Sequence, residues 1–345
     1  MLPGGSVTLY NARAVRILAG DIGGTKTLLA ILERDPAGWR TLHERLLNSR
    51  DIRRFPDALE TFVKEASVDC PIAAFGVPGP VVGRRAQGTN LPWPVDGDDV
   101  ERRLGIRRVV VINDFAAQAL GTLEVGGEDL APLNPGAEAA DPTAPIAVIG
   151  AGTGLGEAFL LSIGGRPRAF GTEGGHADFA PRTDDEVALH RHLRQRFGRV
   201  STERILSGEG LANVYEFLRE HGRHPENPRL RSAIAAAADP TPEISRAALE
   251  ENDPLASAAL DLFVGVYGAE AGNMALRLLA RGGVYVTGGI AAKILPRLRA
   301  GGFLAAFRDK GRLGDLVRRL PVTVVLNPRA GLLGAAAEGL RSQEG

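Results

Sequence analysis

The apolar positions fall into short runs between polar turns, and the runs alternate between strand-like and helix-like spacing. Val15–Ala19 and Leu28–Leu32 flank a glycine-rich turn, which predicts a β-hairpin. Further strands are predicted at Pro71–Val77, Arg108–Ile112, Ile146–Ile149, Ala158–Ile163, Val284–Thr287 and Val322–Leu326. Helices are predicted after Pro56, after Asn113-Asp114, at Asp184–Phe197, after Ser207, at Pro254–Ala280, after Gly288-Gly289 and at Gly331–Leu340. Strands alternating with helices predict an α/β fold.

The opening pattern of strand, Gly/Thr turn and strand returns at 146–163, after a Gly-, Pro- and acid-rich connection at 121–145. We interpret this as a weak internal repeat, once in each half of the chain. A length of 345 residues also favours more than one domain. We expect a small α/β domain of residues 15–124 with 327–345, a large α+β domain of residues 125–326, and a loose extension at residues 1–14.

The composition excludes several classes of protein. Lys and Arg number 41 and Asp and Glu number 41, so the chain lacks the positive charge expected for binding nucleic acid or a membrane surface. The single cysteine, Cys70, excludes a disulfide framework and a multi-cysteine zinc site. No apolar stretch approaches the roughly 18 residues of a membrane helix. We therefore expect a cytoplasmic protein with small-molecule substrates.

The first glycine turn combines features that suit phosphate. Gly23 and Gly24 expose backbone N–H groups, and Thr25 and Lys26 add a hydroxyl and a cation. Asp21 is a hard oxygen ligand that can hold Mg²⁺ directly or through water. The alternative is a plain hairpin turn with a solvated lysine.

Two further glycine clusters are candidates for a nucleotide site. Gly152, Thr153 and Gly154 lie between two strands, so they form neither a P-loop nor a dinucleotide fingerprint. Together with the first turn they could clamp a polyphosphate. Gly288 and Gly289 lie between a strand and a helix, where missing side chains could admit a nucleoside. The alternatives are structural turns and close strand–helix packing.

Polar residues that suit a polyol occur in both halves. Asn113 and Asp114 follow a strand, at the sheet edge where open α/β sheets bind ligands. Asn90 is a further amide in the same half. Each of them could instead cap a helix or close a turn.

In the second half, Glu173 and His176 share a glycine-rich loop, and Glu203 follows Ser201-Thr202. A zinc site at His176 is a weak alternative, because no cysteine or second histidine lies close by. Glu203 could simply be an acid in the first turn of a helix.

The ordered set of motifs resembles that of the bacterial glucokinases. The matching segments are Gly20-Asp21-Ile22-Gly23-Gly24-Thr25, Asn113-Asp114-Phe115, Gly150–Gly156, Glu173–Phe179, Leu206-Ser207-Gly208 and Gly288-Gly289-Ile290. Lys26 resembles instead the related repressor/kinase family, but the cysteine-rich zinc motif of that family has no counterpart here. Thr172 departs from the usual residue before the Glu/His loop.

The resemblance implies an actin-like (ribonuclease H-like) ATPase fold of two domains with the sugar in an interdomain cleft. It implies ATP and Mg²⁺ as cofactors and transfer of the γ-phosphoryl group to the 6-hydroxyl of glucose. By resemblance, Asp114 is the catalytic base, and Asn90, Asn113, Glu173, His176 and Glu203 hold the sugar. We also expect a homodimer. The alternatives are a kinase for mannose or an N-acetylated hexosamine, and a sugar-sensing regulator without activity.

Overall fold

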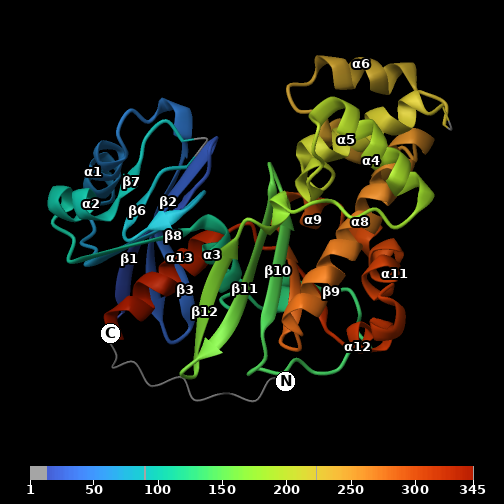
Figure 1. Cartoon of the computed structure of the whole chain (residues 1–345). Helices are drawn as coiled ribbons and strands as arrows, with labels where there is room; N and C mark the ends of the chain where they lie inside the picture. Colours follow the sequence, from blue (N-terminus) through green and yellow to red (C-terminus); the bar gives the residue numbers. More distant parts are fainter. Residues whose placement is uncertain (1–13, 89–90, 223, 345) are drawn as a thin grey trace. The chain divides into compact units, whose positions relative to one another are not determined.

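The computed structural model describes residues 14–88, 91–222 and 224–344, and this described chain divides into two compact units. The first unit runs to Glu124 and resumes at Arg329, and the second holds Val125–Pro328. The predicted N-terminal extension, except Ala14, lies outside the described residues, as does Asn90. Figure 1 shows the strands and helices of both units.

The first unit is a sheet with the strand order β3-β2-β1-β4-β8. Its elements are β1 (Val15–Ile22), β2 (Lys26–Asp35), β3 (Gly38–Asn48), α1 (Phe55–Ala66), β4 (Ile72–Val77), α2 (Gly97–Leu104), β8 (Arg108–Asn113), α3 (Asp114–Gly121) and α13 (Ala330–Arg341). A small separate sheet holds β5 (Val81–Val82), β6 (Arg85–Ala86) and β7 (Val95–Asp96). β1 is antiparallel to β2 and parallel to β4, and β4 is parallel to β8. The parallel strands therefore end at one edge.

Alternate side chains of β1 pack on opposite faces of this sheet, as the period of a strand requires. Leu18 and Ile22 are buried in a cluster with residues of α1, and Ile17 and Ala19 are buried in a cluster with residues of α13. The C-terminal helix α13, red in Figure 1, thus completes the core of the N-terminal strands. Burial on both faces explains why β1 and β4 are almost entirely apolar.

The second unit is built on a sheet with the order β12-β11-β10-β13-β14-β9. Its strands are β9 (Leu130–Pro132), β10 (Ile146–Ala151), β11 (Leu155–Ile163), β12 (Arg166–Thr172), β13 (Gly283–Thr287) and β14 (Val322–Val325). Its α-helices are α4 (Asp184–Phe197), α5 (Gly208–Glu220), α6 (Pro228–Ala236), α7 (Thr241–Leu249), α8 (Pro254–Leu278), α9 (Gly288–Lys293), α10 (Leu295–Arg299), α11 (Gly302–Arg308) and α12 (Gly314–Arg318). Short 3₁₀ turns at Gly174–His176 and Thr202–Arg204 lie between them.

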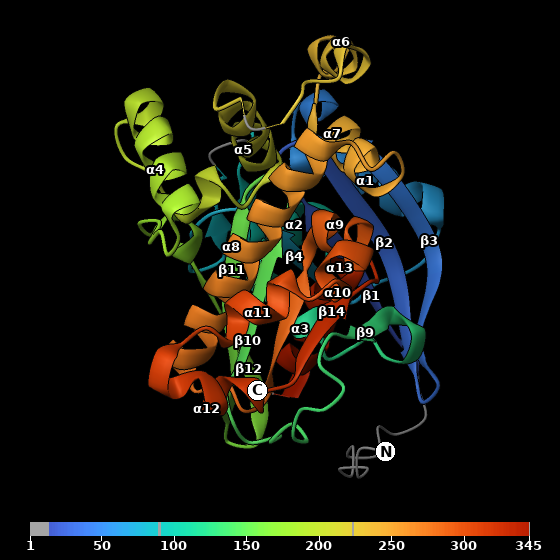
Figure 2. The ribbon, with the colours of Figure 1, turned by 90° about the vertical axis from the view of Figure 1, so that its right-hand side faces the viewer.

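Helix α8 forms the centre of the second unit, as its long run of small apolar residues predicts. Phe263 and Tyr267 are fully buried on it, and α5, α7 and α11 pack against it. Figure 2 shows α8, in orange, running alongside the strands. Asp253 caps the helix by accepting a hydrogen bond from the N–H of Ala256 at 2.9 Å.

The two sheets repeat one pattern of neighbours, which confirms the predicted internal repeat. In each sheet a glycine-turn hairpin, β1–β2 or β10–β11, is extended by an antiparallel strand on one side and by parallel strands on the other. The second turn is shorter than predicted, since only residues 152–154 separate β10 from β11. Among the described residues, no helix is long and apolar enough to span a membrane.

Candidate active site

The backbone of the β1–β2 turn is supported by Ser49, a residue that the sequence did not mark. The Gly23 N–H donates to the carbonyl of Lys26 at 2.8 Å, which closes the turn. Ser49 donates its hydroxyl to the carbonyl of Gly23 at 2.6 Å, and its N–H donates to the carbonyl of Thr25 at 2.9 Å. The side chains of Thr25 and Lys26 are exposed. Ser49 thus fixes the backbone of the turn, and the hydroxyl of Thr25 and the ammonium of Lys26 can reach a phosphate.

Asn113 positions the start of α3 at the end of β8. Its Oδ1 accepts hydrogen bonds from the N–H groups of Phe115 and Ala116, both at 3.0 Å, so it is the N-cap. Its Nδ2 donates to the carbonyl of Gly79 at 3.2 Å. An amide nitrogen carries a second hydrogen, which suits a sugar hydroxyl. The predicted choice between Asn113 and Asp114 as cap is therefore settled in favour of Asn113.

Asp21 and Asp114 lie at the same edge of the first unit, at the ends of β1 and β8. Burial raises the pKa of Asp21 to about 6, and the negative charge of Asp114 contributes to the same shift. A buried carboxylate whose pKa is raised by a neighbouring carboxylate is a favourable setting for a cation. The structure thus brings together the predicted metal ligand and the predicted base.

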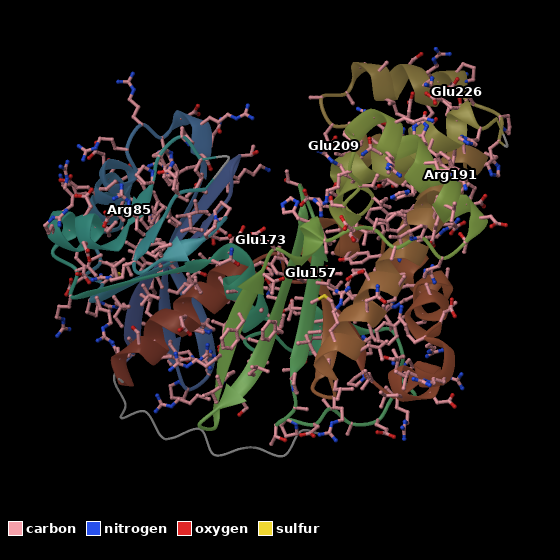
Figure 3. The ribbon with its side chains drawn as sticks, viewed as in Figure 1. Arg85, Glu157, Glu173, Arg191, Glu209 and Glu226 are labelled. Atoms are coloured by element: carbon pink, nitrogen blue, oxygen red, sulfur yellow. The ribbon has the colours of Figure 1, made fainter. Side chains whose placement is uncertain are left out.

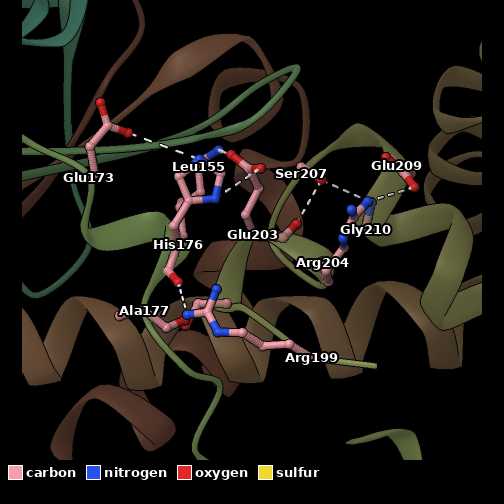
Figure 4. Close-up of polar contacts among 11 residues, drawn as sticks. Leu155, Glu173, His176, Ala177, Arg199, Glu203, Arg204, Ser207, Glu209 and Gly210 are labelled. Carbon is pink, nitrogen blue, oxygen red and sulfur yellow. Dashed lines mark hydrogen bonds and ion pairs between the residues drawn. The ribbon is translucent and has the colours of Figure 1, made fainter. Parts of the chain in front are cut away.

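Three of the predicted sugar ligands converge in the second unit, around the segment Glu173–His176, called the sugar loop below. The His176 Nε2 is 4.0 Å from Oε2 of Glu173, and its Nδ1 is 3.8 Å from Oε1 of Glu203. Figure 4 shows the imidazole between the two carboxylates. The side chains of Glu173 and His176 are 67% and 58% exposed, so both can meet a ligand.

Glu203 also fastens the second glycine turn. Its Oε2 accepts a hydrogen bond from the N–H of Leu155 at 2.9 Å, directly after Gly152–Gly154. The Gly152 carbonyl accepts in turn from the Gly208 N–H at 2.9 Å, where α5 begins. Glu203 lies in a 3₁₀ turn rather than an α-helix. The alternative of a simple acid in the first turn of a helix therefore fails to account for its two contacts.

The sugar loop is supported by Arg199, which no sequence signal marked, and by Thr172, which the sequence marked as a departure from the family motif. Arg199 donates through Nε to Oδ1 of Asp178 at 2.8 Å and through its guanidinium to the carbonyl of His176. Thr172 donates its hydroxyl to the carbonyl of Glu157 at 3.1 Å and accepts from the N–H of Gly174 at 3.1 Å. The residue that departs from the family motif thus holds the loop against β11.

The glycines at the end of β13 meet the end of β10 through Tyr267. The buried Tyr267 hydroxyl accepts from the N–H of Ala151 at 3.0 Å and donates to the carbonyl of Thr287 at 3.3 Å. Gly288 has φ +89°, and a Cβ there would lie 2.5 Å from the carbonyl oxygen of Ala151. Glycine is required at this position for both reasons. The predicted alternative of close strand–helix packing therefore holds for Gly288. A Cβ at Gly289 would have no atom within 4 Å, so the packing does not explain this second glycine.

Comparison with known proteins decides the family. A family model described as Glucokinase matches residues 18–341. The chain belongs to the glucokinase family. A glucokinase of Nostoc punctiforme is 42% identical over 334 residues, which cover 93% of this chain and 97% of that protein.

The solved glucokinases share the fold. A glucokinase from an Antarctic psychrotroph has a TM-score of 0.81 at 28% identity, covering 94% of this chain and 99% of its own. A ROK family glucokinase from Streptomyces griseus, in complex with glucose and AMPPNP, has a TM-score of 0.65 at 23% identity, covering 94% and 99%. The predicted actin-like ATPase fold of the glucokinases, with its two domains, is thereby confirmed.

Proposed function

We propose that this member of the glucokinase family transfers the γ-phosphoryl group of ATP to the 6-hydroxyl of glucose. The observation that carries the proposal is the convergence of Glu173, His176 and Glu203 beside a glycine turn, in a chain that matches the glucokinase family over residues 18–341. Carboxylates accept hydrogen bonds, and an imidazole both accepts and donates them, as several sugar hydroxyls require. A site that pairs each hydroxyl rejects analogues that lack one.

The test of this proposal is ADP release measured over a panel of sugars. We expect the highest kcat/KM with glucose, and lower values with mannose and with N-acetylglucosamine. A higher kcat/KM with either of these two sugars would show that it, and not glucose, is the preferred substrate. Binding of glucose without ADP release would favour the sugar sensor.

In the proposed mechanism Asp114 accepts a hydrogen bond from the 6-hydroxyl and takes its proton as the phosphoryl group arrives. An aspartate is a weak base, with a reference pKa of about 3.9. That suffices when the transition state is loose and the proton leaves late. Asn113, Glu173, His176 and Glu203 orient the sugar, and Asn90, outside the described residues, is proposed as a further ligand.

The phosphates of ATP are proposed to lie against the two glycine turns. In the first turn, Gly24 presents its N–H group, and Thr25 and Lys26 supply the hydroxyl and the cation. The N–H of Gly23, which the sequence also offered for phosphate, is used instead to close the turn. The turn Gly152-Thr153-Gly154 is the corresponding element of the second unit. Gly288 and Gly289 are proposed to border the nucleoside.

The donor set of the first unit fits Mg²⁺ held mainly by phosphate and water. Asp21 offers one carboxylate. Burial and the charge of Asp114 raise its pKa, and a nearby cation would stabilise the charged form and lower that pKa again. In the described part of the chain, no group of three or more His, Cys, Asp or Glu side chains could hold a metal by itself. Magnesium usually keeps several waters and binds through one or two carboxylates plus substrate phosphates. When bound, Mg²⁺ neutralises charge on the transferred phosphates.

Replacing Tyr267 with phenylalanine tests the nucleotide site. The variant leaves the buried N–H of Ala151 without its acceptor, which costs about 1–3 kcal/mol of stability. Because this hydroxyl joins the ends of β10 and β13, we expect the KM for ATP to rise more than the KM for glucose. Denaturant unfolding and steady-state kinetics measure the two effects. Equal changes in both KM values would show that Tyr267 contributes to stability and has no specific effect on ATP binding.

We predict that activity needs no zinc. Cys70 is the single cysteine of the chain, and burial raises the pKa of its thiol to about 12, so it is a poor metal ligand. Exhaustive chelation followed by return of Mg²⁺ should restore full activity. Stoichiometric zinc whose removal unfolds the protein would contradict this expectation.

We further propose that the two compact units are the two functional domains, and that the chain passes from one to the other near residues 124 and 328. The homodimer and the cytoplasmic location expected from the sequence stay predictions. Size-exclusion chromatography with light scattering tests the first of these.

A further inference from the structure

A buried glutamate, Glu157, lies directly beneath the sugar loop and has no place in the proposed mechanism. It belongs to β11 and is 3% exposed. Its Oε1 has no hydrogen-bond partner within the described residues. Figure 3 labels Glu157 and Glu173 in the second unit. A buried polar atom without a partner is costly, so its retention calls for an explanation.

The carboxyl of Glu157 supports the backbone of the sugar loop at Gly174. A Cβ built on Gly174 would lie 2.0 Å from Oε2 and 2.9 Å from Cδ of Glu157. The carboxyl therefore fills the space where any larger residue at 174 would place its side chain. Thr172 joins the backbone of Glu157 to Gly174 by the two hydrogen bonds described above. Displacement of this carboxyl would move the loop between Glu173 and His176.

A second carboxylate, Glu270 of α8, faces Glu157 but has partners of its own. Glu270 accepts from Nη1 of Arg277 at 2.8 Å and from Nδ2 of Asn273 at 2.9 Å. These two donors engage both carboxylate oxygens of Glu270. Burial, and next the charge of Glu270, raise the pKa of Glu157 to about 7, and Arg277 opposes the shift. Near neutral pH, Glu157 therefore holds a proton more readily than an exposed glutamate does.

The other titratable and charged groups on elements around Glu157 offset its charge only in part. They are Tyr267 and Arg277 on α8, Lys310 after α11, and Glu173 and His176 on the sugar loop. Lys310 donates to the carbonyl of Ala269 at 3.0 Å and to Oδ1 of Asn273 at 2.9 Å, so its ammonium is already engaged. An ionised Glu157 would thus be a buried charge beside another carboxylate.

We propose that Glu157 is a positioning residue for glucose: its protonated carboxyl holds the sugar loop in the binding arrangement, and its ionisation weakens glucose binding. This inference rests on the proposed function. Above neutral pH the charged carboxylate must gain water or a donor, which displaces Gly174 and with it Glu173 and His176. Binding of glucose and binding of this proton then favour one another.

The experiment compares glucose binding by calorimetry in the wild type and in Glu157→Gln across the pH range. The amide keeps the shape of the carboxyl and cannot ionise. Between about pH 6 and pH 8.5 we expect the Kd of the wild type to rise about three- to tenfold more than that of the variant. The kcat at saturating glucose should differ by less than about twofold, because the groups that react are unchanged. Equal pH dependence in both proteins would overturn the proposal.

A second variant, Glu270→Gln, keeps the test decisive if Glu157→Gln does not fold. Removal of the opposing charge lowers the pKa of Glu157, so the pH at which glucose binding weakens should move down. An unchanged midpoint would contradict the proposed coupling. Absence of glucose binding by the wild type at every pH would contradict the proposed function itself and this inference with it, whereas binding that is independent of Glu157 would contradict only the inference.

Discussion

The substitution Asp114→Asn is expected to lower kcat by about 10²–10⁴-fold, the usual contribution of a general base. The carboxamide keeps the shape of the side chain at the start of α3 but cannot take the proton of the 6-hydroxyl. The Asp114 carboxylate shares the Phe115 N–H with Asn113, and the oxygen of the carboxamide can accept the same hydrogen bond, so the fold at this edge should persist. Calorimetry should therefore show glucose binding close to that of the wild type, and steady-state kinetics should show the loss of turnover.

Asp98→Asn is the matched control for this prediction. Asp98 is likewise an aspartate in the first turn of a helix of the same unit, and its carboxylate pairs with Arg84 at 2.9 Å on the surface. This variant should keep the kcat of the wild type. A similar kcat for Asp114→Asn and the wild type would show that Asp114 is not the base.

Replacing Glu203 with alanine is expected to raise the KM for glucose by about 10²-fold, because hydrogen bonds to charged groups contribute about 1.5–3 kcal/mol each. The variant removes a proposed sugar ligand and also the acceptor for the Leu155 N–H. His176 loses the carboxylate beside its Nδ1 as well. The effect should therefore exceed that of a sugar contact alone, and the KM for ATP should rise too because the second glycine turn loosens.

The matched control is Glu209→Ala. Glu209, which Figure 4 also labels, is exposed, and its carboxylate pairs with Arg204 at 3.1 Å. Exposed ion pairs contribute about 0–1 kcal/mol, so both KM values should stay within about twofold of the wild type. Equal effects of the two substitutions would remove Glu203 from the site.

The elements that the sequence predicts well are those with one clear source of burial or a strong cap. Helix α4 has its predicted ends, Asp184 and Phe197, because Thr183 caps it and Gly198 ends it. Ser207 caps α5 as predicted, with its hydroxyl accepting from the Gly210 N–H at 2.9 Å. Both glycine-turn hairpins were also predicted correctly.

The edge strands β3, β12 and β9 were not predicted, for a physical reason. β3 and β12 lie at the ends of their sheets and have mostly exposed or half-buried residues, so they lack the alternation that marks a half-buried strand. β9 lies inside the segment interpreted as a connection and is only as long as its pairing with β14. Such a strand is defined by a partner far along the chain, which local sequence patterns do not reveal.

The same distinction applies to the site. The proposed ligands occur in motifs whose residue types suit the chemistry, so the sequence points to them directly. The residues that support them act through contacts between distant segments, as Ser49 does at the first turn, Tyr267 at the nucleotide glycines and Arg199 at the sugar loop. An isolated Ser, Tyr or Arg in a sequence carries no sign of such a contact. Thr172 is the exception, since its departure from the family motif marked it.

The position of the phosphate in the product tests the central claim most directly. The wild type, incubated with glucose, ATP and Mg²⁺, should give a single sugar phosphate, and phosphorus–proton correlation NMR should connect its phosphorus to the methylene protons at carbon 6. That result is predicted by a site in which Asp114 faces the 6-hydroxyl. A phosphorus coupled to the proton at carbon 1, or ADP formed with no sugar phosphate, would contradict it.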